Sequence, residues 1–362
     1  MVDPGLDRVV AAETHLSHVD GERGELIVAG FPVGELAPRA TFEQTTWVLW
    51  NGDLPSAGEL ERFRAALAAE RTLPDGADAL LRACARAALD PMDALRLAAG
   101  TISMSSGTPE AIVGRMPTIV AAYWRLRRGE QPIPPRPDLG HAGNFLYMLS
   151  GEAPDPERTR ALETYLNTVV DHGLNASTFT CRVITSTGSD LVSAIVGAIG
   201  ALKGPLHGGA PGPALDMVFE IGEASRAEAV LRAKLAAGEK LMGFGHRVYR
   251  VRDPRADVLA AAAERLFARA GDKRLYALAR HVEATALRLL DEHKPGRRLQ
   301  TNVEFYTALL LHGLGFDVSL FTPTFAISRV SGWIAHAMEQ KRANRIIRPQ
   351  SEYVGPRGRV WA

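Results

Sequence analysis

The chain has 362 residues, of which 46% are hydrophobic and 23% are charged, and its formal net charge is +1. Such a composition is ordinary for a globular protein of about two domains, and the small net charge gives no support for a nucleic-acid or membrane-surface partner. The two cysteines, Cys84 and Cys181, have no metal-type spacing, so we expect buried thiols in a reducing cytoplasm. The first ten residues lack a basic region followed by an apolar stretch, which argues against a secretory signal.

Helical periodicity dominates the chain, and alternating β patterns are scarce. Strands are expected at 25–29 and, at the C-terminus, around 359–361. Amphipathic stretches rich in Ala, Leu and Arg predict helices at 56–70, 75–88, 110–128, 226–237, 255–269 and 274–293. The fold class is therefore all-α, mainly helical with a minor β ribbon near the N-terminus.

Three further segments complete this pattern. Pro156 follows the cap residue Asp155 and opens a helix that is predicted to run to about residue 171. The apolar stretch 191–202 is too short to span a bilayer and predicts a buried core helix. The proline-rich segment 129–140 is a domain linker or, as we favour, a surface loop, because helical patterning resumes at once in 141–149.

Two histidines stand in short segments that are rimmed by glycine. His207 lies in GPLHGGA (204–210) and His246 in MGFGHRVYRVRDPRA (242–256). Each glycine in a helix interior costs roughly 0.5–1 kcal/mol relative to alanine, so these segments are expected outside helices, where backbone amides can approach a ligand. A third segment, TNVEFY (301–306), supplies Glu304. Two imidazoles and a carboxylate are the groups that proton transfer at neutral pH requires, so the chain is an enzyme candidate.

Two charged residues stand at predicted helix starts. Asp253 and Pro254 predict a cap and first turn, which places Arg255 at a helix N-terminus that attracts anions. Arg255 is then a carboxylate ligand beside His246 or, in the alternative, a surface arginine paired with a glutamate. Glu304 follows the good cap residue Asn302, and it is either a base kept ionised by the helix dipole or simply a favoured first-turn acid.

Other candidates have weaker signals. His172 lies in the polar patch DHGLNASTFT (171–180) and is either a satisfied core histidine or a substrate contact; the other seven histidines are expected to be structural or solvated. Arg329 and Arg348 are not distinguished by their surroundings, although Pro349 favours an extended Arg348. The sequence has no GxxxxGK[ST] phosphate loop, dinucleotide fingerprint, HExxH motif, paired Cys/His cluster or GxSxG elbow.

Taken together, these segments resemble the citrate synthase family. The resemblance covers nearly the whole chain, and its most specific part is the order GPLHGGA, GFGHRVYR…DPR and NVEFY. It implies a mostly helical homodimer whose small domain closes over the substrate, with a large domain at 1–207 and 310–362 and a small domain at 208–309. His207 would lie at the hinge between them. The resemblance also implies that acetyl-CoA and oxaloacetate are the substrates and that the reaction needs no metal or redox cofactor.

The resemblance also assigns roles to individual residues. Glu304 would remove a methyl proton from acetyl-CoA, His207 would donate to the thioester oxygen, and His246 would polarise the oxaloacetate carbonyl. The dicarboxylate would be held by His172, Arg255, Arg329 and Arg348, and Arg348 would reach into the partner subunit's site. Arg250 would contact a phosphate of coenzyme A.

The chain departs from the family at its expected base. The family usually has aspartate where this chain has Glu304. The extra methylene moves the carboxylate by roughly 1 Å, and a misplacement of that size can cost on the order of a hundredfold in rate. Glu304 is still the expected base. Three alternatives stay open: 2-methylcitrate synthase using propionyl-CoA, a lyase that cleaves citryl-CoA, and a catalytically idle homologue that binds CoA or a dicarboxylate, which the departure at Glu304 alone supports.

Overall fold

The computed structural model describes residues 3, 5–6, 9–208, 211–270 and 272–361. Helices dominate them, and a small antiparallel sheet lies near the N-terminus, with strands β1 (Ser17–Asp20), β2 (Glu25–Val28) and β3 (Phe31–Pro32) in the order β1-β2-β3. In the register of the first pair, Ser17 lies opposite Val28 and Asp20 opposite Glu25. The mainly helical class with a minor N-terminal β ribbon is confirmed.

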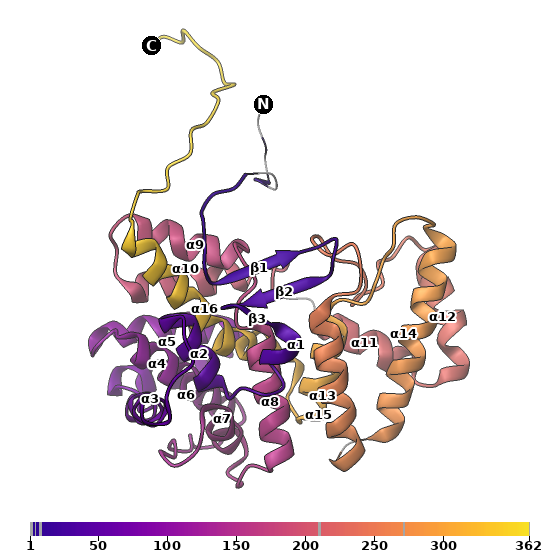
Figure 1. Cartoon of the computed structure of the whole chain (residues 1–362), viewed down its shortest axis with the longest axis horizontal. Coiled ribbons are helices and arrows are strands. Elements are labelled where there is room, and N and C mark those ends of the chain that lie inside the picture. Colours follow the sequence, from indigo (N-terminus) through magenta and orange to yellow (C-terminus); the bar gives the residue numbers. More distant parts are fainter. Residues whose placement is uncertain (1–2, 4, 7–8, 209–210, 271, 362) are drawn as a thin grey trace.

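The helices fall into two groups in Figure 1. One group contains α1 (Val33–Leu36), α2 (Phe42–Asn51), α3 (Ala57–Ala69), α4 (Asp75–Arg86), α5 (Pro91–Gly100), α6 (Pro109–Arg127), α7 (His141–Ser150), α8 (Pro156–Val169), α9 (Ala176–Ser186), α10 (Leu191–Leu202) and α16 (Phe321–Arg342). The other contains α11 (Pro211–Ile221), α12 (Ala227–Ala236), α13 (Pro254–Ala270), α14 (Lys273–His293) and α15 (Val303–Gly313). Contacts of α8 with α13 and α15 join the two groups.

The predicted helix starts are confirmed by their caps. Ser56 and Glu59 form a reciprocal capping box at the start of α3. Asp155 accepts hydrogen bonds from the backbone amides of Glu157 and Arg158, with Pro156 in the first turn of α8. The loop 129–140 connects α6 to α7 without regular structure, as expected for a surface connection.

One expected strand is wrong. Residues 359–361 form no strand, and the chain beyond Ile347, which is hydrogen-bonded to Ser186, runs away from the body as an extended trace (Figure 1). A strand needs a neighbour to pair its backbone groups, and no described residue pairs with 359–361, where the side chains of Val360 and Trp361 are almost fully exposed. The alternation that predicted a strand reflects local composition alone.

Helix α16 passes through the centre of the larger group and is buried over most of its length, including Trp333 and Ile334. Its Gly332 allows a close approach to the end of α8, because a Cβ there would lie 2.3 Å from the carbonyl oxygen of Val170. The side chain of Ser328 donates to the carbonyl of Leu166, which satisfies one of the free carbonyls at a helix C-terminus. The end of α8 is thus fixed by α16.

The apolar helix α10 lies among α5, α9 and α16, as expected for a core helix. Among the described residues, no single helix has both the length and the apolarity to cross a membrane; α15 and the stretch Val318–Arg342 meet the criteria only jointly, and they are bent by 119°. Cys84 and Cys181 are free and buried, as expected.

Candidate active site

Two imidazoles and a phenol meet between the helix groups. The His172 and His246 rings have centroids 5.9 Å apart, and the Tyr249 ring lies 4.8 Å from His246. Nε2 of His172 is 3.1 Å from the Tyr249 hydroxyl oxygen. Residue 172 follows α8, whereas 246 and 249 lie in the loop before α13. The structure therefore brings together two of the predicted histidines from distant parts of the chain.

Arg255 is held beside these rings by Asp253. Nε and Nη2 of Arg255 donate to the two carboxylate oxygens of Asp253 at 3.0 and 2.8 Å, a bidentate geometry that fixes the plane of the guanidinium. Asp253 also accepts from the main-chain N–H of Val303 at 3.1 Å. One buried carboxylate thus joins the first turn of α13 to the first turn of α15 and orients Arg255.

The backbone fixes the protonation of His246. Its Nδ1 accepts hydrogen bonds from the main-chain N–H groups of Val248 and Tyr249 at 3.0 and 3.1 Å. Burial, followed by the charge of Arg255, lowers the pKa of His246 to about 4, so the ring is neutral near pH 7. The single proton of the neutral ring must then be on Nε2, which makes that atom a donor.

His207 lies in the segment after α10, and its ring contacts a residue of α9 that is itself hydrogen-bonded to α16. Its Nε2 is 2.8 Å from Oγ of Ser177 and accepts from the main-chain N–H of the same residue at 3.4 Å. The indole Nε1 of Trp333 donates to the same Ser177 Oγ at 3.1 Å. Burial, with the Arg329 charge as the second cause, lowers the pKa of His207 to about 4. The ring is neutral, and its proton is on Nδ1. Residues 209 and 210 of the GPLHGGA motif lie outside the described residues.

Arg329 is a buried cation at the end of α8. Its Nε donates to the carbonyl of Val169 at 2.7 Å, and its guanidinium lies over the Phe325 ring at 4.7 Å. Burial lowers the pKa of Arg329 to about 10, so the group stays charged at neutral pH. That charge in turn contributes to lowering the pKa of His172, after burial and Arg255.

Glu304 stands in the first turn of α15, where Asn302 caps the helix through its side-chain oxygen. The side chain is largely buried, and burial raises its pKa to about 7, against the opposing influence of Arg255. A carboxylate with such a pKa can both take up and release a proton at neutral pH. Arg255 also lowers the pKa of His172 and His246, so its charge influences three of the predicted site residues.

A short bridge ties the His246 loop to α15. Phe244 pairs with Thr301 in an isolated antiparallel bridge, and the Asn302 side chain donates to the carbonyl of Gly245 at 2.7 Å. Gly243 packs against the helix start, where a Cβ would lie 2.9 Å from Cβ of Phe305. A cavity of about 280 Å³ lies beside this bridge and is lined by residues 240–247 and Asn302. The close glycine packing sets the position of His246 relative to Glu304.

The turn of the N-terminal hairpin packs on the other side of the same loop. The main-chain N–H of Arg250 donates to the carbonyl of Gly21 at 2.8 Å. A Cβ on Gly21 would lie 2.2 Å from the carbonyl oxygen of Val248. The loop that carries His246 is therefore held between the hairpin and α15.

Two predicted site residues lie apart from this cluster. Arg250 is exposed on the loop. Arg348 is exposed in the extended segment after α16 (Figure 1), just beyond Ile347, whose main-chain N–H donates to Ser186 at the end of α9. Within this chain, Arg348 does not join the other predicted residues.

Sequence reasoning missed three residues that support the site. Tyr249 contacts two imidazoles, Asp253 was seen only as a helix cap, and Trp333 was not singled out. The sequence did hold a signal for the role of Asp253, because a capping aspartate two residues before an arginine can accept hydrogen bonds from the guanidinium. No group of three or more His, Cys, Asp or Glu side chains placed to hold a metal occurs in the described part of the chain.

Comparisons with known proteins identify the family of this chain. The family model described as citrate synthase, C-terminal domain, matches residues 5–350. Citrate synthase 2 of Bacillus subtilis is 41% identical over 97% of this chain and 95% of its own length. The 2-methylcitrate synthase of Mycobacterium tuberculosis is also 41% identical, over 99% of this chain and 92% of its own length.

Two solved structures show the same fold. The crystal structure of citrate synthase from Pyrobaculum aerophilum is 37% identical, with a TM-score of 0.90 over 100% of this chain and 96% of that one. A complex of citrate synthase from Thermoplasma acidophilum with carboxymethyl coenzyme A and oxaloacetate is 29% identical, with a TM-score of 0.90 over 100% and 98%. The chain belongs to the citrate synthase family, whose members are condensing enzymes of the transferase class.

Proposed function

We propose that this enzyme condenses acetyl-CoA with oxaloacetate and hydrolyses the resulting citryl thioester to citrate and CoA. One observation carries the proposal: a neutral His246 and a charged Arg255 present hydrogen-bond donors side by side, near a carboxylate, Glu304, whose pKa is about 7. Such a site can polarise a ketone and remove a weakly acidic proton. Relatives of nearly equal length that carry the name citrate synthase support it.

The dicarboxylate would be held by two arginines and an imidazole. Arg255 and Arg329 are buried and charged, and guanidinium groups bind carboxylates through paired hydrogen bonds. Nε of Arg329 is used by Val169, while its two Nη atoms make no hydrogen bond with the described residues and can face a ligand. His172 would complete the set as a neutral hydrogen-bonding partner.

The condensation follows from the protonation states. Glu304 takes a methyl proton from the thioester while Nδ1–H of His207 donates to the thioester oxygen, where enolate charge develops. The methyl carbon then bonds to the ketone carbon of oxaloacetate, and His246 and Arg255 stabilise the negative charge on the ketone oxygen. This oxygen becomes a hydroxyl by taking up a proton, which balances the proton that Glu304 removed. Water then cleaves the thioester and releases the CoA thiol. The electron count is conserved, so no redox cofactor enters this reaction, and imidazole and guanidinium donors take the place of a metal.

Glutamate at position 304 is consistent with this role. The Asn302 cap and the Asp253 bond to Val303 fix the first turn of α15. The longer side chain therefore starts from a defined backbone position, and its raised pKa gives a base matched to neutral pH.

The proposal extends to domains, assembly and coenzyme binding. A large domain of residues 1–207 and 310–362 would close on a small domain of residues 208–309, with His207 at the hinge. This closure would exclude water before condensation.

In a homodimer, the exposed Arg348 would reach the partner subunit's site, which agrees with its place on an extended segment. Arg250 would bind a phosphate of coenzyme A. Two free cysteines fit a cytoplasmic enzyme.

The test follows free thiol with oxaloacetate and either acetyl-CoA or propionyl-CoA at matched concentrations. The proposal predicts a higher kcat/KM with acetyl-CoA. A higher value with propionyl-CoA would favour the second candidate, 2-methylcitrate synthase, which the Mycobacterium relative supports; one methyl group is worth only about 1–3 kcal/mol of discrimination. No thiol release with either thioester contradicts both.

A further inference from the structure

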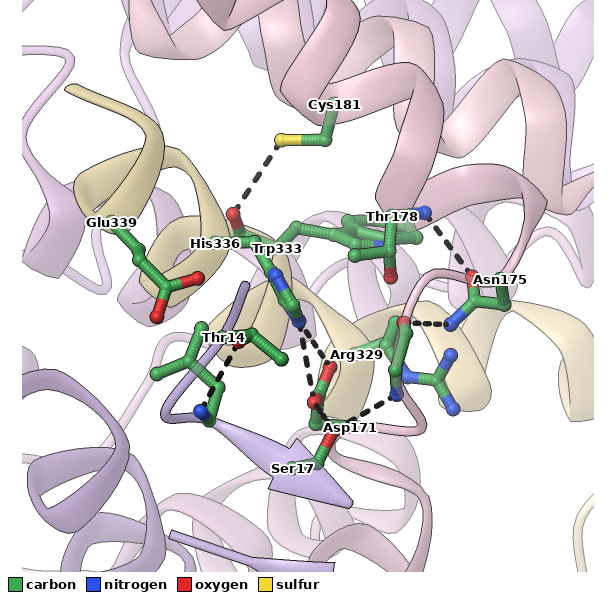
Figure 2. Close-up of polar contacts among 12 residues, drawn as sticks. Thr14, Ser17, Asp171, Asn175, Thr178, Cys181, Arg329, Trp333, His336 and Glu339 are labelled. Atoms are coloured by element: carbon green, nitrogen blue, oxygen red, sulfur yellow. Dashed lines mark hydrogen bonds and ion pairs between the residues drawn. The ribbon is translucent and has the colours of Figure 1, made fainter. Parts of the chain in front are cut away.

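A buried polar chain lies directly behind His172. Figure 2 shows Asp171 between Ser17 of β1 and His336 of α16. Both Asp171 and His336 are fully buried, and Nε2 of His336 lies 3.2 and 3.3 Å from the two Asp171 carboxylate oxygens. Oγ of Ser17 donates to Asp171 Oδ2 at 2.5 Å. Burying so many polar groups is costly, so a role beyond packing is expected.

The hydrogen-bond directions place the ring proton of His336 against Asp171. Nη1 of Arg182 lies 3.0 Å from Nδ1 of His336, and arginine can only donate. Nδ1 is therefore unprotonated, the ring proton is on Nε2, and this proton points at Asp171. The charge of Arg182 is balanced by Glu339 at 2.7 Å. Burial alone would raise the pKa of Asp171, but His336, Arg329 and Ser17 together hold it below its ordinary value.

The Asp171 carboxylate fixes the backbone on both sides of His172. Asp171 itself precedes His172, and Ser17 Oγ, which donates to Asp171, accepts the main-chain N–H of Gly173 at 2.9 Å. Gly173 has a φ of +58°, a conformation that L side chains rarely adopt. His172 is thus held between two residues that are anchored to the same serine–aspartate pair.

The same set of buried polar residues is connected to Arg329 through helix α16. His336 follows Arg329 by seven residues, so the two side chains share one face of the helix. The carboxylate of Asp171 also favours the charged form of Arg329, against the effect of burial. A negative charge at Asp171 therefore acts on two of the residues that would hold the dicarboxylate.

We propose that Ser17, Asp171 and His336 are positioning residues that hold His172 and Arg329 in the geometry that binds the dicarboxylate substrate. This inference rests on the proposed function, because the substrate is the oxaloacetate of that reaction. None of the three needs to touch the substrate. Their effect is expected on oxaloacetate binding and not on binding of the thioester.

The test uses the full-length enzyme with Ser17→Ala, Asp171→Asn and His336→Gln. We expect KM for oxaloacetate to rise about threefold in Ser17→Ala and about tenfold or more in the other two, with KM for acetyl-CoA within about twofold of the wild type. Calorimetric titration with oxaloacetate alone should show matching losses of affinity. Ser17→Thr keeps the hydroxyl and should restore the wild-type KM.

A second buried histidine provides the control. His141 in α7 is buried with its ring stacked on Phe42 at 4.7 Å, and neither of its ring nitrogens has a hydrogen-bond partner among the residues that the structure describes. His141→Gln should lower the melting temperature and leave both KM values unchanged.

Three outcomes overturn the positioning role: unchanged KM for oxaloacetate in all three variants, equal changes in both KM values, or loss of folding even in Ser17→Ala. A wild-type enzyme that neither binds oxaloacetate nor releases thiol would instead contradict the proposed function.

Discussion

Nε2 of His246 lies 3.3 Å from Nη2 of Arg255, although both atoms are donors once Nδ1 of His246 accepts two backbone amides. Two donors at this distance cannot bond to each other, and a single oxygen placed between them would satisfy both. A ketone oxygen that gains negative charge during attack is such an acceptor. The pair is therefore organised for a transition state before any substrate binds.

Replacing Arg255 with lysine tests this organisation. A lysine ammonium cannot make the two parallel bonds to Asp253 that orient the guanidinium. We expect KM for oxaloacetate to rise by about 10- to 100-fold and kcat to fall, as measured by thiol release. Arg288→Lys is the matched control, since Arg288 pairs with exposed glutamates on the surface of α14 and should leave both constants unchanged. Equal effects in the two variants would contradict a specific role for Arg255.

The pH dependence of the rate should report Glu304. A base must be deprotonated to act, and burial raises the pKa of Glu304 to about 7. We therefore expect kcat/KM for acetyl-CoA to fall about tenfold per pH unit below pH 7. His207 and His246, with pKa values of about 4, stay neutral in that range and add no second step. A rate that stays constant from pH 7 down to pH 5 would exclude this assignment.

The same group should make the fold less stable at high pH. The pKa of Glu304 in the folded chain, about 7, lies above its ordinary value of 4.5. The folded state therefore binds this proton more tightly, and the resulting stability is complete below pH 4.5 and is lost as the pH rises through 7. We expect Glu304→Gln to be more stable than the wild type at pH 8, by on the order of 3 kcal/mol, and nearly equally stable near pH 4.5. Urea unfolding at both pH values measures this; a destabilised Glu304→Gln at pH 8 would refute it.

Gly21 should be intolerant of a side chain. An added Cβ would lie 2.2 Å from the carbonyl oxygen of Val248, so alanine must push the His246 loop away from the hairpin. We expect Gly21→Ala to lower kcat by at least about tenfold, because misplacement of a reacting group by about 1 Å can cost a hundredfold. Gly34→Ala is the control, since nothing lies within 4 Å of its added Cβ, and it should retain full activity. Wild-type kcat in Gly21→Ala would show that the hairpin does not position the loop.

Much of the fold followed from local sequence signals. The caps Ser56 and Asp155 and the amphipathic stretches predicted their helices, because caps and helical periodicity act over a few residues. The expected strand at 359–361 failed because pairing is decided by neighbours far along the chain, and no described strand pairs with this segment.

The candidate site was predictable where chemistry and local structure coincide. His207, His246 and Arg255 stood out through the glycines and the helix start around them. Other contacts of the site join residues far apart in the sequence: Tyr249 and His172 are 77 positions apart, and His336 and Asp171 are 165 positions apart. No local pattern in the sequence encodes such pairs, so only the folded chain reveals them.

The central claim is that Glu304 removes a methyl proton so that a carbon–carbon bond can form. The most direct test supplies acetyl-CoA carrying three deuterium atoms on its methyl group, together with oxaloacetate, and weighs the product by mass spectrometry. The account predicts citrate that retains two deuterium atoms, with product formation strongly reduced in Glu304→Gln. Acetate that retains all three deuterium atoms, released together with CoA, would show simple thioester hydrolysis and would contradict the account.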